Sequence, residues 1–326
     1  MLTCPPPEDN IPPLLPVLLP ALTTILKSTT QDPTPCLSLT IKLLSPLPLT
    51  RTLTIADPPS LLSALRSPLP GANLLALAIL HKAAATPADA AILGTLPELV
   101  EELVRRWLDA DDVGVAERAA RVLGDILETD CDVVPSPNPQ DQPQVNGVNG
   151  VNGDATQLVR RTRPPGHGHV WALFLESRPI TSLIPQLCSP SASRTTHQTS
   201  LSQGRLLRLL PRLATLKISA LTTTSSPDLF PSDGPQSGLL PWAALAMVDK
   251  SDVLMHLNLV DFLETLVSVM RVAENRTRET DEILGQLIRT AVRGDEQLAT
   301  ALRGLPDRTV EEEAEPLRVY INGLLG

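Results

Sequence analysis

The chain has 326 residues, with 27 lysines and arginines against 36 aspartates and glutamates, a formal net charge of −9 and a pI of about 5.1. An acidic chain lacks the positive field that draws proteins to phosphates, so this charge disfavours nucleic-acid binding and slightly favours a basic partner. Only 2% of the residues are aromatic, and leucine, alanine and valine supply the apolar mass. Leucine and alanine favour helices, whereas a large β-sheet needs more aromatic and β-branched residues.

The cysteines and the amino terminus indicate a compartment. Cys4, Cys36, Cys131 and Cys188 are scattered, which fits reduced thiols better than a disulfide framework. The amino terminus has no basic segment ahead of its apolar stretch, so we expect no signal peptide. No run of about 18 uninterrupted apolar residues predicts a membrane span. We therefore expect a soluble protein of the cytoplasm or nucleus.

Prolines divide the N-terminal region into short leucine-rich segments. The chain has 33 prolines, roughly twice the average usage, and most of them lie between apolar segments. Proline is favoured in the first turn of a helix, so many of these residues open helices. The helices predicted in this region are Pro12–Leu26, Pro35–Leu44, Pro58–Leu65 and Asn73–Ala85.

A helical hairpin is predicted next. From Leu96 to Leu108, apolar residues recur every three or four positions, and charged residues that include Glu102 occupy the other face. A short acidic turn, Asp109–Asp112, leads into a second amphipathic helix at Val113–Glu128. Two antiparallel helices joined by a tight turn are the unit of an α-solenoid.

Residues 132–165 break this pattern. The segment contains Pro-Ser-Pro-Asn-Pro at 135–139 and three Val-Asn-Gly triplets within 145–153, without apolar periodicity. We predict a flexible linker or disordered insertion that interrupts the superhelix. It separates N-terminal helical repeats in residues 1–131 from C-terminal repeats of the same solenoid in residues 166–326.

Helical patterns resume after the insertion. The strongest is Asp252–Ala273, whose predicted apolar face includes Val253, Leu254 and Leu257. A loop is predicted at Thr222–Ser237. The other predicted helices are His169–Ser177, 179–188, 201–213, 213–223, 280–293, 295–303 and 310–322.

An internal similarity favours repeats. When the chain is shifted by 140 residues, Asp112 and Val113 align with Asp252 and Val253, and the apolar positions that follow also align. The aspartate in each segment is expected to cap the N–H groups of its helix. The shift equals about three repeats of roughly 40–47 residues, the armadillo and HEAT period. Chance remains an alternative, because amphipathic helices superimpose easily.

No pattern of residues predicts catalysis, a cofactor or a metal. His167 and His169 make an incomplete metal site and fit better as a turn leading into a helix. Arg160, Arg161 and Arg163 form a short basic cluster without interleaved aromatic residues. No Gly-x-Ser-x-Gly turn or cysteine nucleophile signature occurs. We expect a protein that is not an enzyme.

Several segments together resemble a known family. They are Ala116–Glu128 (AERAARVLGDILE), His169–Pro179 (HVWALFLESRP), Leu239–Val248 (LLPWAALAMV) and Asp252–Met270 (DVLMHLNLVDFLETLVSVM). Across roughly residues 75–290 the chain resembles the proteasome non-ATPase regulatory subunit 5 family, in its fungal base-assembly chaperone branch. The yeast member of that branch is named as a DNA mismatch repair protein.

The resemblance implies an armadillo/HEAT-like α-solenoid. It also implies a monomeric chaperone without cofactors, which binds the C-terminal domain of a proteasomal ATPase subunit during assembly of the regulatory-particle base and then leaves. The exposed polar positions of two predicted helices are the candidate partner-binding residues, namely Arg118, Arg121, Asp125, Asn258, Asp261 and Glu264. The alternative is a generic armadillo/HEAT-type adaptor in another pathway, such as DNA repair or transport.

Overall fold

The computed structural model describes residues 18, 21–22, 33–133, 164–232 and 236–326. Every regular element in these ranges is a helix, so the prediction of an all-α chain is confirmed. The α-helices are, in chain order, α2 (Thr34–Leu44), α3 (Leu49–Ile55), α4 (Pro58–Arg66), α5 (Pro70–Leu80), α6 (Pro87–Gly94), α7 (Pro97–Asp109), α8 (Val113–Thr129), α9 (His169–Glu176), α10 (Arg178–Cys188), α11 (Thr196–Thr222), α12 (Leu239–Leu245), α13 (Val253–Arg271), α14 (Arg278–Val292), α15 (Glu296–Gly304) and α16 (Glu311–Leu325). Two short 3-10 helices are η2 (His81–Ala84) and η4 (Pro306–Arg308).

Proline opens many of the N-terminal helices. Pro58, Pro70, Pro87 and Pro97 lie in the first turn of α4, α5, α6 and α7. A helix loses no hydrogen bond there, because its first N–H groups have no partner within the helix. The predicted use of proline as a separator of helices is thus confirmed for this region.

Two predictions of helix boundaries are wrong. The two helices predicted at 201–213 and 213–223 lie within α11, but they meet at a kink at Lys217, where φ is −157° and ψ is 69°, and not at residue 213. The apolar periodicity of the sequence does not identify α6 and α12, which have 8 and 7 residues. Helices this short contain few turns of a periodic pattern and depend on tertiary packing.

Two predicted segments lie mainly outside the described residues. Of the helix predicted at Pro12–Leu26, the structure describes Leu18, Ala21 and Leu22, which are helical. Residues 134–163 of the predicted insertion, with the basic cluster at 160–163, are not among the described ranges.

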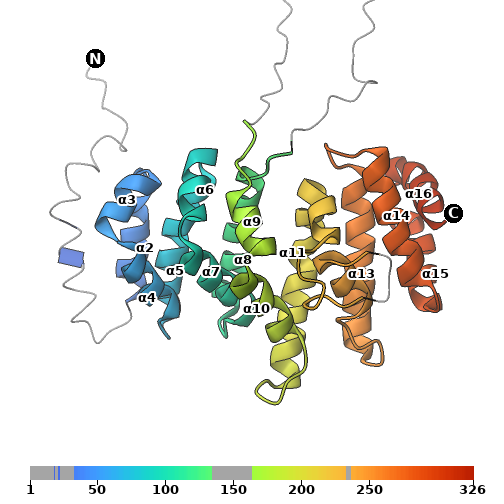
Figure 1. Ribbon diagram of the computed structural model, residues 1–326, viewed down its shortest axis with the longest axis horizontal. Helices are drawn as coiled ribbons and strands as arrows, with labels where there is room; N and C mark the ends of the chain where they lie inside the picture. The colour runs from blue at the N-terminus through green and yellow to red at the C-terminus, as the bar shows by residue number, and fades with distance from the viewer. Residues whose placement is uncertain (1–17, 19–20, 23–32, 134–163, 233–235) are drawn as a thin grey trace, which may run out of the picture.

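The helices follow one another along the long axis of the molecule in chain order, from α2–α4 at one end to α14–α16 at the other (Figure 1). In one row, α5 packs against α8, α8 against α11, α11 against α13 and α13 against α15. Beside that row, α4 packs against α7 and α7 against α10. Buried apolar side chains form one continuous cluster from Leu44 to Leu324. Each helix therefore forms the core together with helices that are close to it along the chain.

The residues that follow α8 and those that precede α9 lie against each other. The N–H of Gly166 donates to the carbonyl of Cys131 at 2.7 Å, and the N–H of Gly168 donates to that of Asp130 at 2.9 Å. A Cβ at position 166 would lie 2.1 Å from the carbonyl carbon of Asp130, so this approach requires glycine. The insertion does not interrupt the packing of the described helices, because α9 packs directly against α6 and α8.

Asp130 stabilises this contact between the end of α8 and the start of α9. Its buried carboxylate accepts hydrogen bonds from the N–H groups of Val170 at 2.6 Å and Trp171 at 3.2 Å. The indole N–H of Trp171 in turn donates to the carbonyl of Leu127 at 2.8 Å. The carboxylate satisfies the first N–H groups of α9 and faces the positive end of that helix. Asp130 therefore joins the end of α8 to the start of α9.

Two predicted helix faces are corrected. Glu102, expected on the exposed face of α7, is only 2% exposed and pairs with Arg66 of α4 and Arg106. The arginines replace the water that a buried carboxylate loses. Conversely, Val253, Leu254 and Leu257, expected on the buried face of α13, are exposed. They lie in the first turns of that helix, where no neighbour among the described residues covers them.

Among the described residues, α13 is the one helix long and apolar enough to cross a membrane by length and composition. Core helices of soluble proteins have the same length and composition. Half of its apolar stretch is buried inside the protein, and α13 packs against α11, α15 and α16. The apolar character of α13 therefore has an explanation in helix packing.

Replacing Asp130 tests the junction between α8 and α9. We expect Asp130→Ala to lower the free energy of unfolding by about 1–3 kcal/mol, because two buried N–H groups lose their acceptor. Asp130→Asn keeps an acceptor oxygen and should cost less. Urea denaturation measures both changes, and an alanine variant as stable as the wild type would contradict this role.

Candidate protein-binding surface

The six candidate residues lie on α8 and α13, two helices that both begin at an aspartate cap. The side chain of Asp112 accepts from the N–H of Val115 at 2.8 Å. That of Asp252 accepts from the N–H groups of Leu254 at 2.9 Å and Met255 at 3.2 Å. The predicted capping of both helices is confirmed. We call Arg118, Arg121 and Asp125 the α8 stripe, and Asn258, Asp261 and Glu264 the α13 stripe. Helix α11 packs between α8 and α13, so both stripes belong to the same row of helices.

Two residues of the α8 stripe form contacts with other helices of the protein. Arg121 is exposed, whereas Arg118 and Asp125 are half-buried. His81, at the end of α5, contacts both of them. Its Nδ1 lies 3.2 Å from Nη2 of Arg118, and its Nε2 lies 2.6 Å from the carboxylate of Asp125. Because a guanidinium can only donate, Nδ1 accepts and Nε2 carries the proton.

Arg212 of α11 completes this chain of polar contacts. Its Nη2 donates to Asp125 and to Glu128, each at 2.6 Å. Burial raises the pKa of Asp125, but the hydrogen bonds from Arg212 and His81 outweigh it and hold the pKa below its ordinary value. The three helices α5, α8 and α11 are thus linked along one surface by alternating charged and polar groups.

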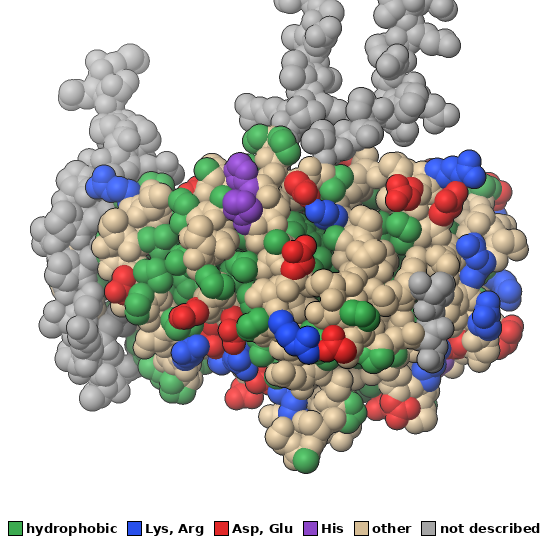
Figure 2. Space-filling view, in the orientation of Figure 1, with side chains coloured by type: hydrophobic (Ala, Val, Ile, Leu, Met, Phe, Trp, Pro, Cys, Tyr) green, Lys and Arg blue, Asp and Glu red, His purple; other side chains and the backbone are tan. Residues whose placement is uncertain are grey.

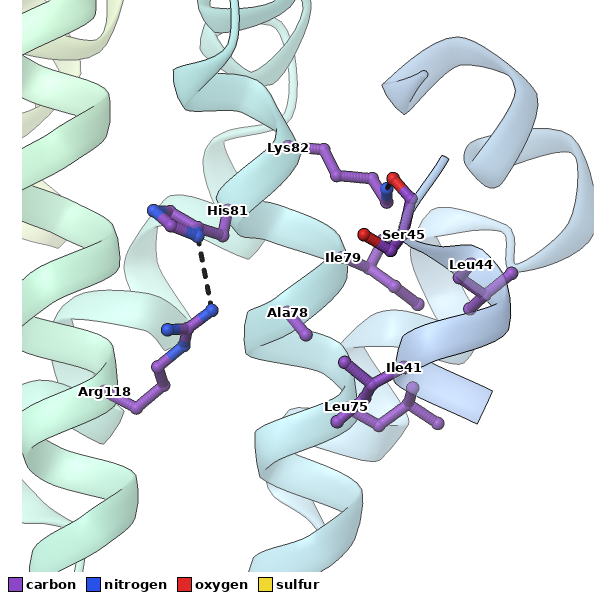
Figure 3. A pocket seen from close by; sticks show the side chains of 9 residues that line it. All are labelled: Ile41, Leu44, Ser45, Leu75, Ala78, Ile79, His81, Lys82 and Arg118. Carbon is purple, nitrogen blue, oxygen red and sulfur yellow. Dashed lines mark hydrogen bonds between the residues drawn. The ribbon is translucent and has the colours of Figure 1, made fainter. Parts of the chain in front are cut away.

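A cavity of about 240 Å³ lies beside Arg118 (Figure 3). Arg118 and His81 lie at one end, while Lys82 and residues of α2 lie at the other. The ammonium of Lys82 donates to the carbonyls of Ser45 at 3.0 Å and Leu47 at 2.7 Å, just beyond the end of α2. Burial lowers the pKa of Lys82. Lys82 therefore holds the end of α2 against η2.

The α13 stripe borders an open groove of about 500 Å³ that α15 and η4 complete. Asn258 and Asp261 are exposed. The side chain of Glu264 is only 12% exposed and pairs with Arg308 of η4 at 2.5 Å. The hydrogen bond to Glu264 raises the pKa of Arg308. Asp261 and Leu257 therefore remain the more accessible side chains on the α13 side of this groove.

The structure adds residues that sequence periodicity did not identify. His81, Lys82, Arg212 and Arg308 contact or adjoin the predicted stripes, but each belongs to another helix. Their single charges carry no local pattern in the sequence, and only the packing of helices brings them to the stripes. Figure 2 shows hydrophobic side chains gathered over the N-terminal helices of the visible face, with charged ones scattered more widely.

Other candidate chemistry has a structural explanation. His167 and His169 lie in the turn into α9, where Gly168 has a φ of 71°. No group of three or more potential metal ligands occurs in the described part of the chain. Burial raises the pKa of the thiols of Cys131 and Cys188, which disfavours their reactive thiolate form.

Comparisons with known proteins identify no family for this chain. No protein-family model matches the sequence, and no curated protein matches it.

The pKa of Asp125 gives a test of the α8 contacts. Because the native carboxylate binds protons less readily than the unfolded one, Asp125 stabilises the fold above about pH 4. This contribution is lost as the pH falls through the lower native pKa. We expect the melting temperature to fall more between about pH 5 and about pH 3 in the wild type than in Asp125→Asn. Equal falls in the two proteins would contradict the pairing.

Proposed function

We propose that this chain is a non-catalytic α-solenoid scaffold that binds a folded protein partner. Its partner would be the C-terminal domain of a proteasomal ATPase subunit during assembly of the regulatory-particle base. The observation that carries the scaffold proposal is the row of helices from α5 through α8, α11 and α13 to α15, in which spatial order follows chain order. Helices stacked in this way provide an extended surface for binding.

The row supplies two kinds of contact for a partner. On α8, the exposed Arg121 lies next to paired charges, which favours orientation and specificity over affinity. At the start of α13, Val253, Leu254 and Leu257 are 72%, 71% and 48% exposed. Apolar side chains that a partner can cover provide much of the affinity in protein interfaces. The groove beside Leu257 offers a place for one apolar group of the partner.

The identity of the partner depends on the resemblance to the proteasome non-ATPase regulatory subunit 5 family. A small folded domain that spans the outer faces of α8, α11 and α13 would form an interface of standard size, about 800 Å² on each partner. Release requires only that a later assembly component cover the same face of the ATPase subunit. No bond is broken in this cycle, so it needs neither a cofactor nor a catalytic residue.

The contacts of His81 support a non-catalytic role for the charged cluster on α8. A histidine that acts as a general base needs a free ring nitrogen within reach of a nucleophile. Both nitrogens of His81 are engaged, one by Arg118 and one by Asp125. The cluster therefore serves helix packing and surface charge better than proton transfer.

Affinity purification tests the partner. We expect the tagged full-length chain, at native expression, to recover a proteasomal ATPase subunit, and the purified C-terminal domain of that subunit to bind directly. Loss of the chain should leave free base intermediates to accumulate. Recovery of a different dominant partner, with no proteasome subunit, would favour the adaptor alternative and count against the assembly chaperone.

Charge reversal tests the surface. We expect Arg121→Glu combined with Asp261→Arg to weaken partner binding by about tenfold or more, because like charges across an interface repel. Both side chains are exposed, so folding should be unaffected. Arg278→Glu, on an exposed face of α14 outside this row, is the matched control. Calorimetry with the recovered partner measures the affinities, and equal weakening by the control would exclude this surface.

A further inference from the structure

The cavity beside Arg118 has an aliphatic side and a cation at each end, Arg118 and Lys82. It lies across α5, between α2 and α8, as Figure 3 shows. The aliphatic side chains that line it come from α2 and α5 and are Ile41, Leu44, Leu75, Ala78 and Ile79. The small side chain of Ala78, at the middle of this lining, leaves room above α5. The remaining lining residues are Ser45, His81, Lys82 and Arg118.

The electrostatic character of this cavity is opposite to that of the whole chain. It is lined by two cations and by no acidic residue, although the chain has a net charge of −9. The nearest carboxylate in this network, that of Asp125, contacts His81 with one oxygen and Arg212 with the other. Arg212 lies on the far side of Asp125 from His81 and is shared with Glu128. An anion in the cavity would meet the guanidinium of Arg118, which pairs with no described carboxylate.

Arg118 retains hydrogen-bonding capacity toward such an anion. Within the described chain, its guanidinium donates from Nη2 to Nδ1 of His81, and it forms no ion pair with a described carboxylate. A guanidinium has five N–H groups in a planar fork that matches a carboxylate. A carboxylate ligand can therefore bind Arg118 without displacing His81.

We infer that this cavity binds a carboxylate carried on a short branched aliphatic chain, with the carboxylate at Arg118 and the aliphatic part against α2 and α5. The cavity volume of about 240 Å³ gives room for one small branched aliphatic group. Two sources share this chemistry. One is a free branched-chain acid, and the other is the C-terminal residue of a peptide that ends in leucine or a similar residue.

This inference does not depend on the proposed partner. The cavity is bounded by α2, α5 and α8. The exposed apolar residues in the first turns of α13, and the groove beside them, lie farther along the row. A chain that failed to bind any proteasomal subunit could still bind the acid, and the converse also holds.

Calorimetry with the full-length chain tests the ligand class. The probes are N-acetyl-L-leucine and 4-methylpentanoate, and the controls are N-acetyl-L-leucinamide and acetate. We expect both probes to bind. The amide should bind at least about tenfold more weakly, because it lacks the charge that pairs with Arg118. Acetate should also bind more weakly, since each buried CH₂ group changes affinity by about fourfold.

Three variants separate this cavity from general surface binding. Arg118→Gln removes the cation, and Ala78→Leu fills the space over α5 while keeping the cation. We expect each to weaken binding of N-acetyl-L-leucine by about tenfold or more. Arg51→Gln, at an exposed position of α3 outside the lining, should change it by less than about twofold. Thermal unfolding checks that each variant is folded. If Arg118→Gln does not fold, the affinity of Ala78→Leu for N-acetyl-L-leucine decides the test.

The two probes identify the source. Tighter binding of 4-methylpentanoate indicates a free acid, and tighter binding of N-acetyl-L-leucine indicates the end of a peptide. Three results would overturn the inference: no binding of either acid, equal binding of the amide, or wild-type affinity in folded Arg118→Gln and Ala78→Leu.

Discussion

The structure depends on one constraint, which is that no helix can bury its apolar face alone. Buried side chains form a continuous interior from Leu44 to Leu324, and each helix completes it with helices close to it in order. Trp107 of α7 and Phe174 of α9 show this, since their ring centroids are 6.5 Å apart although the insertion separates them in sequence. Because neighbours occupy only part of the circumference of each helix, the outer faces of the row stay accessible.

Buried polar groups determine how neighbouring helices meet along this interior. Asp130 joins α8 to α9, and Glu102 joins α7 to α4. Asn73 of α5 donates to the carbonyls of Ala64 and Leu65 at the end of α4, at 2.9 Å and 2.8 Å. Leucine and alanine can pack in many registers, whereas a buried polar group is satisfied in few. These contacts therefore select one arrangement of helices that the apolar core alone would leave open.

The sequence predicted helix type well and helix environment less well. Periodicity located α7, α8 and α13, and the aspartates before α8 and α13 correctly marked their caps. It placed Glu102 on an exposed face and Val253 on a buried one, because it identifies the sides of a helix and not the neighbours that cover them. The same limit explains the candidate site. Nothing in the local pattern of α8 indicates that His81 and Arg212, from other helices, contact Arg118 and Asp125.

These environments divide the candidate surface into groups with different physical roles. Where a charge already has a partner, as Glu264 has in Arg308, a bound protein gains little by approaching it and must first break that pair. Where a charge is free on an exposed face, as at Asp261, it can orient a partner at small cost. Where apolar side chains are exposed, as at Leu254, covering them removes apolar surface from water. A partner that follows the row would therefore gain its orientation from single exposed charges and most of its affinity from the first turns of α13.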